Sequence, residues 1–275
     1  MTNYPQNRAL LWYGAQKVVS WALELIFPKT CLGCGKFTSS LRSQHNTNLR
    51  IHTNATNNSR NDFDYLCRKC FGKIDLKSTL ECIGCKRQTQ YGLTCVFCKK
   101  NGFIDQLLIA TDLSNPLVDR ILKTYKYEFI TDLANPLSVI LEKFVRKLAS
   151  KGINIFEDNP LVVPVPLHKR RLNWRGFNQA QLLAETVADS FLVSCGEDVL
   201  LRVGHSKNQA DTNSKEERFK NIRGQFVVQK KEVIKNRTII LVDDICTSGA
   251  TLNECARVLK ENGAKRVIGF VVARG

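Results

Sequence analysis

The stretch ILVDDICTSGAT, at residues 240–251, narrows the possible folds of this chain more than any other feature of it. Three aliphatic residues run into Asp243 and Asp244, and a small, hydroxyl-rich turn at residues 247–251 follows at once. Two adjacent carboxylates repel each other and add nothing to the packing of a strand, so they need another explanation. We expect a buried strand, a turn and a helix in direct succession here.

Strand and helix patterns alternate from about residue 102 onward. Strands are expected at residues 106–111, 161–165, 226–228, 238–242 and 267–272. Helices are expected at residues 116–126, 133–148, 179–191 and 251–261, the last of them ended by Gly263. This alternation predicts an α/β fold with a mainly parallel, twisted sheet and flanking helices. In such sheets ligands bind beyond the carboxyl ends of the strands, which is where the two aspartates would lie.

The turn after the aspartates suits a phosphate. Its backbone N–H groups would converge on one spot at the positive end of the helix dipole, and Gly249 would let the backbone approach closely. The residues of this turn are Thr247, Ser248, Gly249, Ala250 and Thr251. Asp243 and Asp244 suit vicinal sugar hydroxyls, with or without a magnesium ion. The implied ligand is a ribose 5-phosphate group, and the alternative is an acidic pair that only caps a surface turn.

Eight of the eleven cysteines form four CxxC pairs, which predict metal binding. The pairs are Cys31/Cys34, Cys67/Cys70, Cys82/Cys85 and Cys95/Cys98. Two such pairs complete a closed four-cysteine site, so we expect two structural zinc ions in a double zinc ribbon. Sequential pairing, first with second and third with fourth, is preferred to an interleaved arrangement. Disulfides or redox pairs are the alternatives, but disulfides need a secreted protein, and a redox CxxC usually stands alone.

The chain is strongly basic. Lysine and arginine exceed aspartate and glutamate by 41 − 25 = 16 charges, which suggests a polyanionic partner such as phosphates or nucleic acid. The basic residues beside the cysteines either touch such phosphates or only offset the charge of the thiolates.

No apolar run reaches the roughly 20 residues needed to cross a bilayer. The first apolar segment has mostly helical spacing and lacks a signal-peptide cleavage site, so we expect a soluble, cytoplasmic protein. The expected organisation is an amphipathic helix at residues 1–28, the double zinc ribbon at 29–101 with a polar insertion at 38–62, and the α/β domain at 102–275.

The strand, the aspartate pair and the Thr/Ser-Gly-x-Thr turn resemble the phosphoribosyl pyrophosphate signature of type I phosphoribosyltransferases. Further segments are similar to the ComF family of competence-associated proteins (the ComFC/GntX type). They are residues 163–171 (VPVPLHKRR), 175–179 (RGFNQ), 207–209 (KNQ), 217–218 (ER), 221–224 (NIRG) and 26–31 (IFPKTC), together with the four CxxC pairs. The resemblance covers about residues 20–275. It implies a type I phosphoribosyltransferase fold that follows an N-terminal zinc ribbon.

The resemblance also implies two different functions. In one, the protein binds phosphoribosyl pyrophosphate with magnesium and takes part in DNA uptake during natural transformation. Single-stranded DNA and other competence proteins, such as a helicase or the uptake machinery, would be its partners. In the other, it is an active phosphoribosyltransferase that acts on an unidentified small-molecule or nucleobase acceptor. The acceptor pocket would then be built from residues 103–130.

Phosphoribosyl transfer releases a pyrophosphate that bears several charges, so basic side chains must stabilise it. Residues 164–176 are placed to form the pyrophosphate loop, while Lys169 and Arg170 equally suit a solvated basic face. The candidate catalytic residues are Asp243, Asp244, Arg175, Lys207 and Arg218. The candidate ligand-binding residues are the two aspartates, the turn at residues 247–251, Arg171, Arg175 and Gly176.

Residues 202–231 carry 8 basic and 3 acidic side chains and few apolar anchors. This composition predicts a mobile lid over a phosphate-rich ligand, with a surface loop as the alternative. The expected contacts in the lid are Lys207, Gln209, Arg218 and Arg223. Aromatic residues interleaved with basic ones are few, so the sequence supports DNA binding only weakly. Those considered are Tyr65, Phe71, Tyr91, Phe97 and Phe103.

Overall fold

A computed structural model describes residues 29–38, 63–204 and 215–275. The expected N-terminal helix, nearly all of the polar insertion, and Lys207 and Gln209 lie outside the described residues. The helices are α2 (Arg68–Phe71), α3 (Val96–Lys99), α4 (Pro116–Tyr127), α5 (Ala134–Ala149), α6 (Lys169–Arg175), α7 (Gln179–Ser190), α8 (Lys215–Ile222) and α9 (Ala250–Glu261), with short 3-10 helices η2 (Gln90–Gly92) and η3 (Thr131–Leu133). The strands are β1 (Gln106–Asp112), β2 (Leu161–Pro164), β3 (Ser194–Cys195), β4 (Leu200–Arg202), β5 (Phe226–Val228), β6 (Thr238–Cys246) and β7 (Arg266–Arg274).

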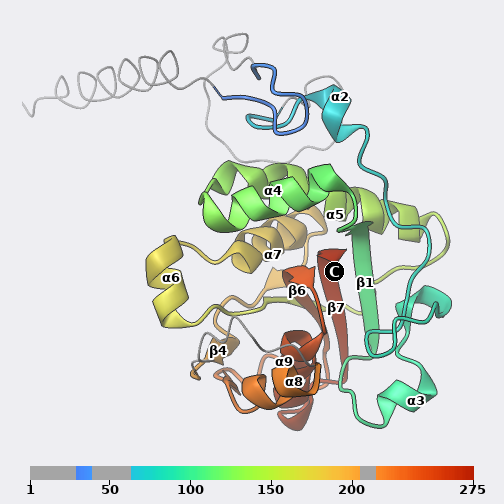
Figure 1. Cartoon of the computed structure of the whole chain (residues 1–275). Coiled ribbons are helices and arrows are strands. Elements are labelled where there is room, and N and C mark those ends of the chain that lie inside the picture. The colour runs from blue at the N-terminus through green and yellow to red at the C-terminus, as the bar shows by residue number, and fades with distance from the viewer. Residues whose placement is uncertain (1–28, 39–62, 205–214) are drawn as a thin grey trace, which may run out of the picture.

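Five parallel strands form the central sheet, in the order β1-β7-β6-β2-β3. The two longest strands, β6 and β7, are neighbours, paired from Thr238 with Arg266 to Cys246 with Arg274 (Figure 1). Their residues are buried on both faces for most of their length, as expected of parallel strands that helices cover on either side. The predicted α/β fold with a mainly parallel sheet and flanking helices is confirmed.

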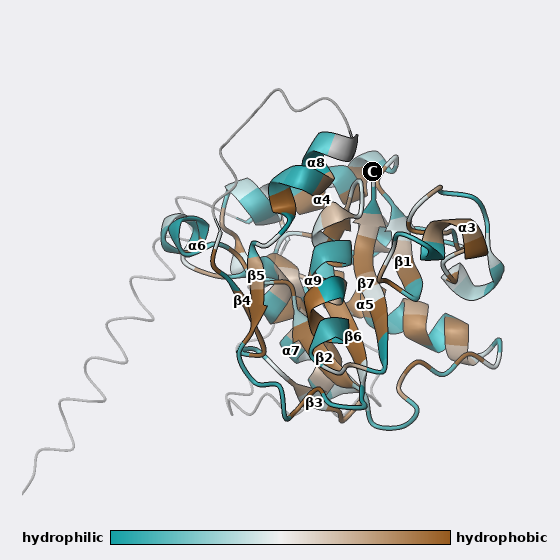
Figure 2. Ribbon diagram, turned by 90° about the horizontal axis from the view of Figure 1, so that it is seen from below, coloured by the Kyte–Doolittle hydropathy of each residue, from teal (hydrophilic) through white to brown (hydrophobic). Residues whose placement is uncertain are grey.

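Helices α4, α5 and α7 cover one face of the sheet, and α9 covers the other (Figure 2). Alternate residues of β6 enter the two cores, because successive side chains of a strand point to opposite faces. Ile240 and Val242 pack with α4, α5 and α7, whereas Ile239 and Leu241 pack with α9. On the same side of the sheet as α9, strand β5 of the antiparallel β4–β5 pair contacts α9, and so does α8. Within the described ranges, no helix combines the length and apolar character that a membrane crossing requires.

Three segments differ from the predicted boundaries in ways that matter for the site. β6 continues to Cys246 instead of ending at Val242, because its ladder with β7 runs on past the aspartates. Residues 169–175, expected in a loop, form α6, whose first turn is capped by the Nδ1 atom of His168. Part of the predicted lid is the helix α8, and Phe219 anchors it on the core.

Candidate functional site

The turn that follows β6 leads straight into α9. Gly249 precedes the helix with φ of +80°, a left-handed conformation that suits glycine, and it is buried. The N–H group of Ala250 donates to Ser248 Oγ at 3.4 Å, and Thr247 is exposed. The first N–H groups of a helix have no carbonyl partner within it, so this end of α9 offers donors to an anion.

The two aspartates lie inside the end of β6 and, as neighbours in a strand, point to opposite faces. Asp244 is 5% exposed, and one of its oxygens lies 2.9 Å from Lys126 Nζ at the end of α4. The Asp243 Oδ1 atom accepts the N–H of Asp244 at 2.9 Å. Burial, and then the negative charge of Asp244, raise the pKa of Asp243 above its usual value. The acidic pair is therefore costly in the free protein, and hydroxyl donors or a cation placed beside it would lower that cost.

Arg175 and Gln179 present unused donors near this pair. Arg175 Nη1 donates to Gln179 Oε1 at 3.1 Å, but the buried Arg175 Nε and Gln179 Nε2 atoms have no hydrogen-bond acceptor in the described structure. The Arg175 guanidinium lies over the ring of Tyr127, which follows the lysine that pairs with Asp244; burial lowers the pKa of Arg175, and the charge of Asp244 opposes that shift. Buried donors without partners cost free energy, and an anionic ligand would satisfy both.

The other predicted residues lie at differing distances from this centre. Arg171 is exposed on α6, and its charge acts on the pKa of Arg175. Gly176 ends α6 in the left-handed region, with φ of +78°, and its N–H bonds to the carbonyl of Leu172. Arg218 is exposed on α8, and within the described ranges no hydrogen bond or ion pair joins it to either aspartate.

Two basic residues near the aspartates were not among the predicted site residues. Lys126 forms an ion pair with Asp244, and the basic residues at the end of α4 are the sequence feature that could have identified it. Arg202 on β4 is 8% exposed and donates to Gln225 Oε1 from Nε (3.2 Å) and Nη2 (2.8 Å). Burial lowers the pKa of Arg202, and the charge of Asp243 opposes that shift. No sequence pattern marks a buried arginine on a short strand.

The cysteines form two separate clusters, each made of two successive CxxC pairs, as predicted. The first cluster is Cys31, Cys34, Cys67 and Cys70, and the second is Cys82, Cys85, Cys95 and Cys98. Within each cluster the four sulfurs lie within 4.8 Å of one another. The Sγ atoms of Cys34 and Cys67 are 3.9 Å apart, and those of Cys85 and Cys95 are 3.8 Å apart. A tetrahedral zinc with bonds of about 2.3 Å requires sulfurs about 3.8 Å apart, so both clusters fit zinc.

The first cysteine of each cluster has a lowered pKa, for the same reason in both clusters. Burial alone would raise the pKa of Cys31 and of Cys82, but hydrogen bonds from backbone N–H groups lower each to about 6. The Cys31 Sγ atom, for example, accepts the N–H of Cys67 at 3.3 Å. Thiolates are the form that binds zinc, so this backbone arrangement favours the metal-bound state.

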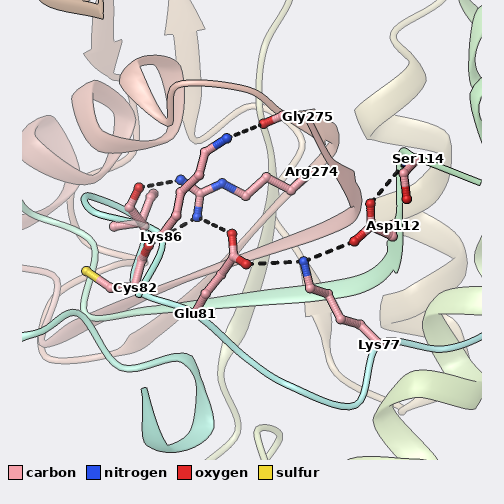
Figure 3. A network of polar contacts seen from close by, with 9 residues as sticks. Lys77, Glu81, Cys82, Lys86, Asp112, Ser114, Arg274 and Gly275 are labelled. Atoms are coloured by element: carbon pink, nitrogen blue, oxygen red, sulfur yellow. Dashed lines mark hydrogen bonds and ion pairs between the residues drawn. The ribbon is translucent and has the colours of Figure 1, made fainter. Parts of the chain in front are cut away.

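Each cluster begins with a short Cys-x-Gly-Cys knuckle that docks on the α/β fold. The first knuckle, residues 31–34, contacts α4, where Arg120 Nη1 donates to the carbonyl of Leu32 at 2.7 Å. The second knuckle, residues 82–85, lies beside the last residues of β7 (Figure 3). There the buried Arg274 donates to the carbonyls of Cys82 (3.1 Å) and Ile83 (2.6 Å) and pairs with Glu81 at 2.9 Å.

Comparison with known proteins identifies related sequences. A phosphoribosyl transferase domain model matches residues 178–275, which contain β6, the aspartates, the turn and α9. Competence protein F of Haemophilus influenzae is 26% identical over 230 residues, covering 78% of this chain and 99% of that protein. Competence protein ComFC of Bacillus subtilis is 28% identical over 218 residues, covering 76% and 84%. DNA utilization protein YhgH of Escherichia coli is 25% identical over 170 residues, covering 62% and 72%.

Proposed function

Since this chain is a ComF-family, phosphoribosyltransferase-like protein, we propose that it binds phosphoribosyl pyrophosphate, or a similar ribose 5-phosphate, at the end of β6. The observation that carries the proposal is the pair of buried, unsatisfied donors, Arg175 Nε and Gln179 Nε2, close to the aspartate pair. One ligand supplies both missing partners, because its phosphate oxygens accept from the unsatisfied donors and its hydroxyl groups donate to the carboxylates.

The parts of the ligand are assigned by chemistry. The N–H groups at the start of α9, with Thr247 and Ser248, hold the 5-phosphate. Asp243 and Asp244 accept the ribose hydroxyls, and Lys126 exchanges its ion pair with Asp244 for that contact. Arg175 and Gln179 donate to the pyrophosphate, with Arg171 nearby. Magnesium carried on the pyrophosphate oxygens would supply further neutralisation of the leaving group.

The biological role we propose is in DNA uptake during natural transformation, with contact to single-stranded DNA. Two observations support this role: two related proteins are named competence proteins, and the whole chain carries a net charge of +16. A basic surface attracts any nucleic acid, so the predicted binding should weaken steeply as salt is raised. Other competence proteins are proposed partners on the same grounds.

Calorimetry with phosphoribosyl pyrophosphate and magnesium tests the ligand. The native protein should bind, and the double variant Asp243→Asn with Asp244→Asn should not. Asp119→Asn is the control, because Asp119 is an acidic residue of α4 whose partner is Lys123 on the same helix. No heat with the native protein, or equal heat with the double variant, would contradict the proposal.

The alternative function is catalytic transfer of the phosphoribosyl group to an unidentified acceptor. The aspartate pair and the donors for pyrophosphate favour it as much as they favour binding alone. Release of pyrophosphate in the presence of nucleobases or nucleic acids, lost in the same double variant, would establish it. Persistent binding without turnover across those acceptors would exclude them as substrates.

A further inference from the structure

Among the described helices of seven or more residues, α6 buries none of its side chains, a property it shares with the four-residue α3. A surface helix normally places an apolar stripe against the core. The sequence of α6, KRRLNWR, instead carries four basic residues and no acid, together with exposed Leu172 and Trp174. Both views show α6 standing away from the sheet and its covering helices (Figures 1 and 2).

Three aromatic rings join α6 to the end of α4. Trp174 meets Phe129 edge-on, with ring centroids 5.0 Å apart and planes at 89°. Phe129 adopts φ of +59°, a backbone conformation that residues other than glycine rarely adopt, so holding its ring in this place costs free energy. Tyr127 lies under the Arg175 guanidinium, 5.8 Å from its ring centroid. Trp174 remains 62% exposed and Tyr127 60% exposed.

These rings border the candidate site. Tyr127 follows Lys126, the partner of Asp244, and Trp174 precedes Arg175, which has the unsatisfied Nε atom. A group that stacks on the rings would therefore lie next to a sugar phosphate held by the aspartates and Arg175. The neighbouring Lys169, Arg170 and Arg171 supply positive charge along the same helix.

We propose that α6, Tyr127 and Trp174 form a stacking surface for the bases of single-stranded DNA; this inference rests on the proposed function. Exposed flat rings beside cations fit a ligand with alternating bases and phosphates, since every base can stack and every phosphate is an anion. An acidic protein segment would use the cations but not the rings. A duplex would keep its bases stacked inside the helix and away from Trp174. The charge and the rings together therefore favour the single strand.

The experiment measures the affinity of the full chain for a short oligothymidylate by fluorescence anisotropy, and for a phosphodeoxyribose polymer of equal length that lacks bases. Trp174→Ala and Tyr127→Ala should each lower oligothymidylate affinity by roughly fivefold or more, because one stacked base is worth that much. Affinity for the polymer without bases should not change. Phe97→Ala is the matched control, because Phe97 is 72% exposed beside basic residues of the zinc ribbon.

A second variant isolates the charge. Lys169→Gln with Arg170→Gln should weaken binding to both polymers and reduce the dependence of affinity on salt, while the difference between the two polymers persists. Polyglutamate that competes as well as oligothymidylate would overturn the proposal. Equal losses for Trp174→Ala on both polymers, or no loss on either, would overturn it as well.

Calorimetry of the Trp174→Ala variant with phosphoribosyl pyrophosphate separates this inference from the proposed function. The expected result is unchanged binding of that ligand together with lost oligothymidylate affinity. If the native protein binds the sugar phosphate but not oligothymidylate, only the stacking surface is wrong. If it binds oligothymidylate through Trp174 but not the sugar phosphate, only the ribose-phosphate site is wrong.

Discussion

Ile83 of the second knuckle lies so close to Gly249 of the turn that a Cβ atom at position 249 would stand 2.8 Å from Ile83 Cγ1. Real Cβ atoms do not approach carbon so closely, so one of the two segments would have to move. The candidate zinc centre and the candidate phosphate-binding turn are thus in direct contact. A change in either segment should therefore be measurable in the other.

Replacing Gly249 with alanine should weaken the binding of phosphoribosyl pyrophosphate and lower the free energy of unfolding. The clash with Ile83 and the left-handed backbone each cost roughly 1–3 kcal/mol. Gly152→Ala is the control, since Gly152 has φ of +76° but open space where a Cβ would lie. It shares the backbone strain without the clash, so equal effects of the two substitutions would show that contact with Ile83 is unimportant. Calorimetry and chemical denaturation provide the two measurements.

Loss of the second zinc should impair the turn more than loss of the first. Cys34 and Cys85 are the exposed members of equivalent knuckles, so Cys34→Ser and Cys85→Ser form a matched pair. Each should lower the zinc content by one ion per chain, as determined by metal analysis. Only Cys85→Ser should also lower the affinity for phosphoribosyl pyrophosphate, by about tenfold or more, because the knuckle that contacts Gly249 loses its structure. Unchanged zinc content in either variant would contradict the metal assignment.

Arg274 should be the strongest single link between the second knuckle and the sheet. Its side chain is 2% exposed, and Arg274→Met would leave the carbonyl of Ile83 without this donor and Glu81 with one cation, Lys77 at 3.2 Å, instead of two. Leaving a buried charge with no partner costs about 3–5 kcal/mol, and because Lys77 still pairs with Glu81 we expect a loss of about 2–3 kcal/mol of unfolding free energy. Adding Glu81→Gln should restore part of the loss by removing a carboxylate that has lost one of its two cations. Lys86→Met is the control with an expected cost below about 1 kcal/mol, because Lys86 makes one exposed hydrogen bond, to Gly275.

The sequence predicted those parts of the fold whose cause is local. The CxxC spacing identified the eight ligands, and of the two pairings that it left open the preferred sequential one is confirmed by the structure. The alternation of apolar runs and helical patterns located strands β1, β2, β6 and β7 and the helices that cover them, but not the two-residue edge strand β3. The end of β6 was placed too early, because aspartate is poorly suited to strands and the ladder with β7 that overrides this preference is a tertiary contact.

Contacts between distant residues could not be predicted in this way. The α6 segment has no apolar stripe, so its helix was missed, and the rings of Phe129 and Trp174 meet only through the fold. The aromatic residues considered from the sequence therefore do not include Tyr127 or Trp174. Arg202 was likewise missed, since its burial depends on Gln225. Which donors lack an acceptor, as in Arg175, is a property of packing alone.

The stability of the free protein should depend on pH through Asp243. Burial and the charge of Asp244 raise its pKa in the folded state above the value near 4 expected when unfolded. The folded protein then binds this proton more tightly than the unfolded chain, so the contribution of Asp243 to stability is greatest at acidic pH and declines as pH rises from about 4 through the folded pKa. Asp243→Asn removes this titration, and its unfolding free energy relative to the native protein should increase with pH over that range. Denaturation curves collected between acidic and mildly alkaline pH check the trend. If the difference in unfolding free energy between variant and native protein is constant across the range, the pKa of Asp243 is not raised by folding. A variant that is more stable but binds no sugar phosphate would show that Asp243 serves binding and not folding.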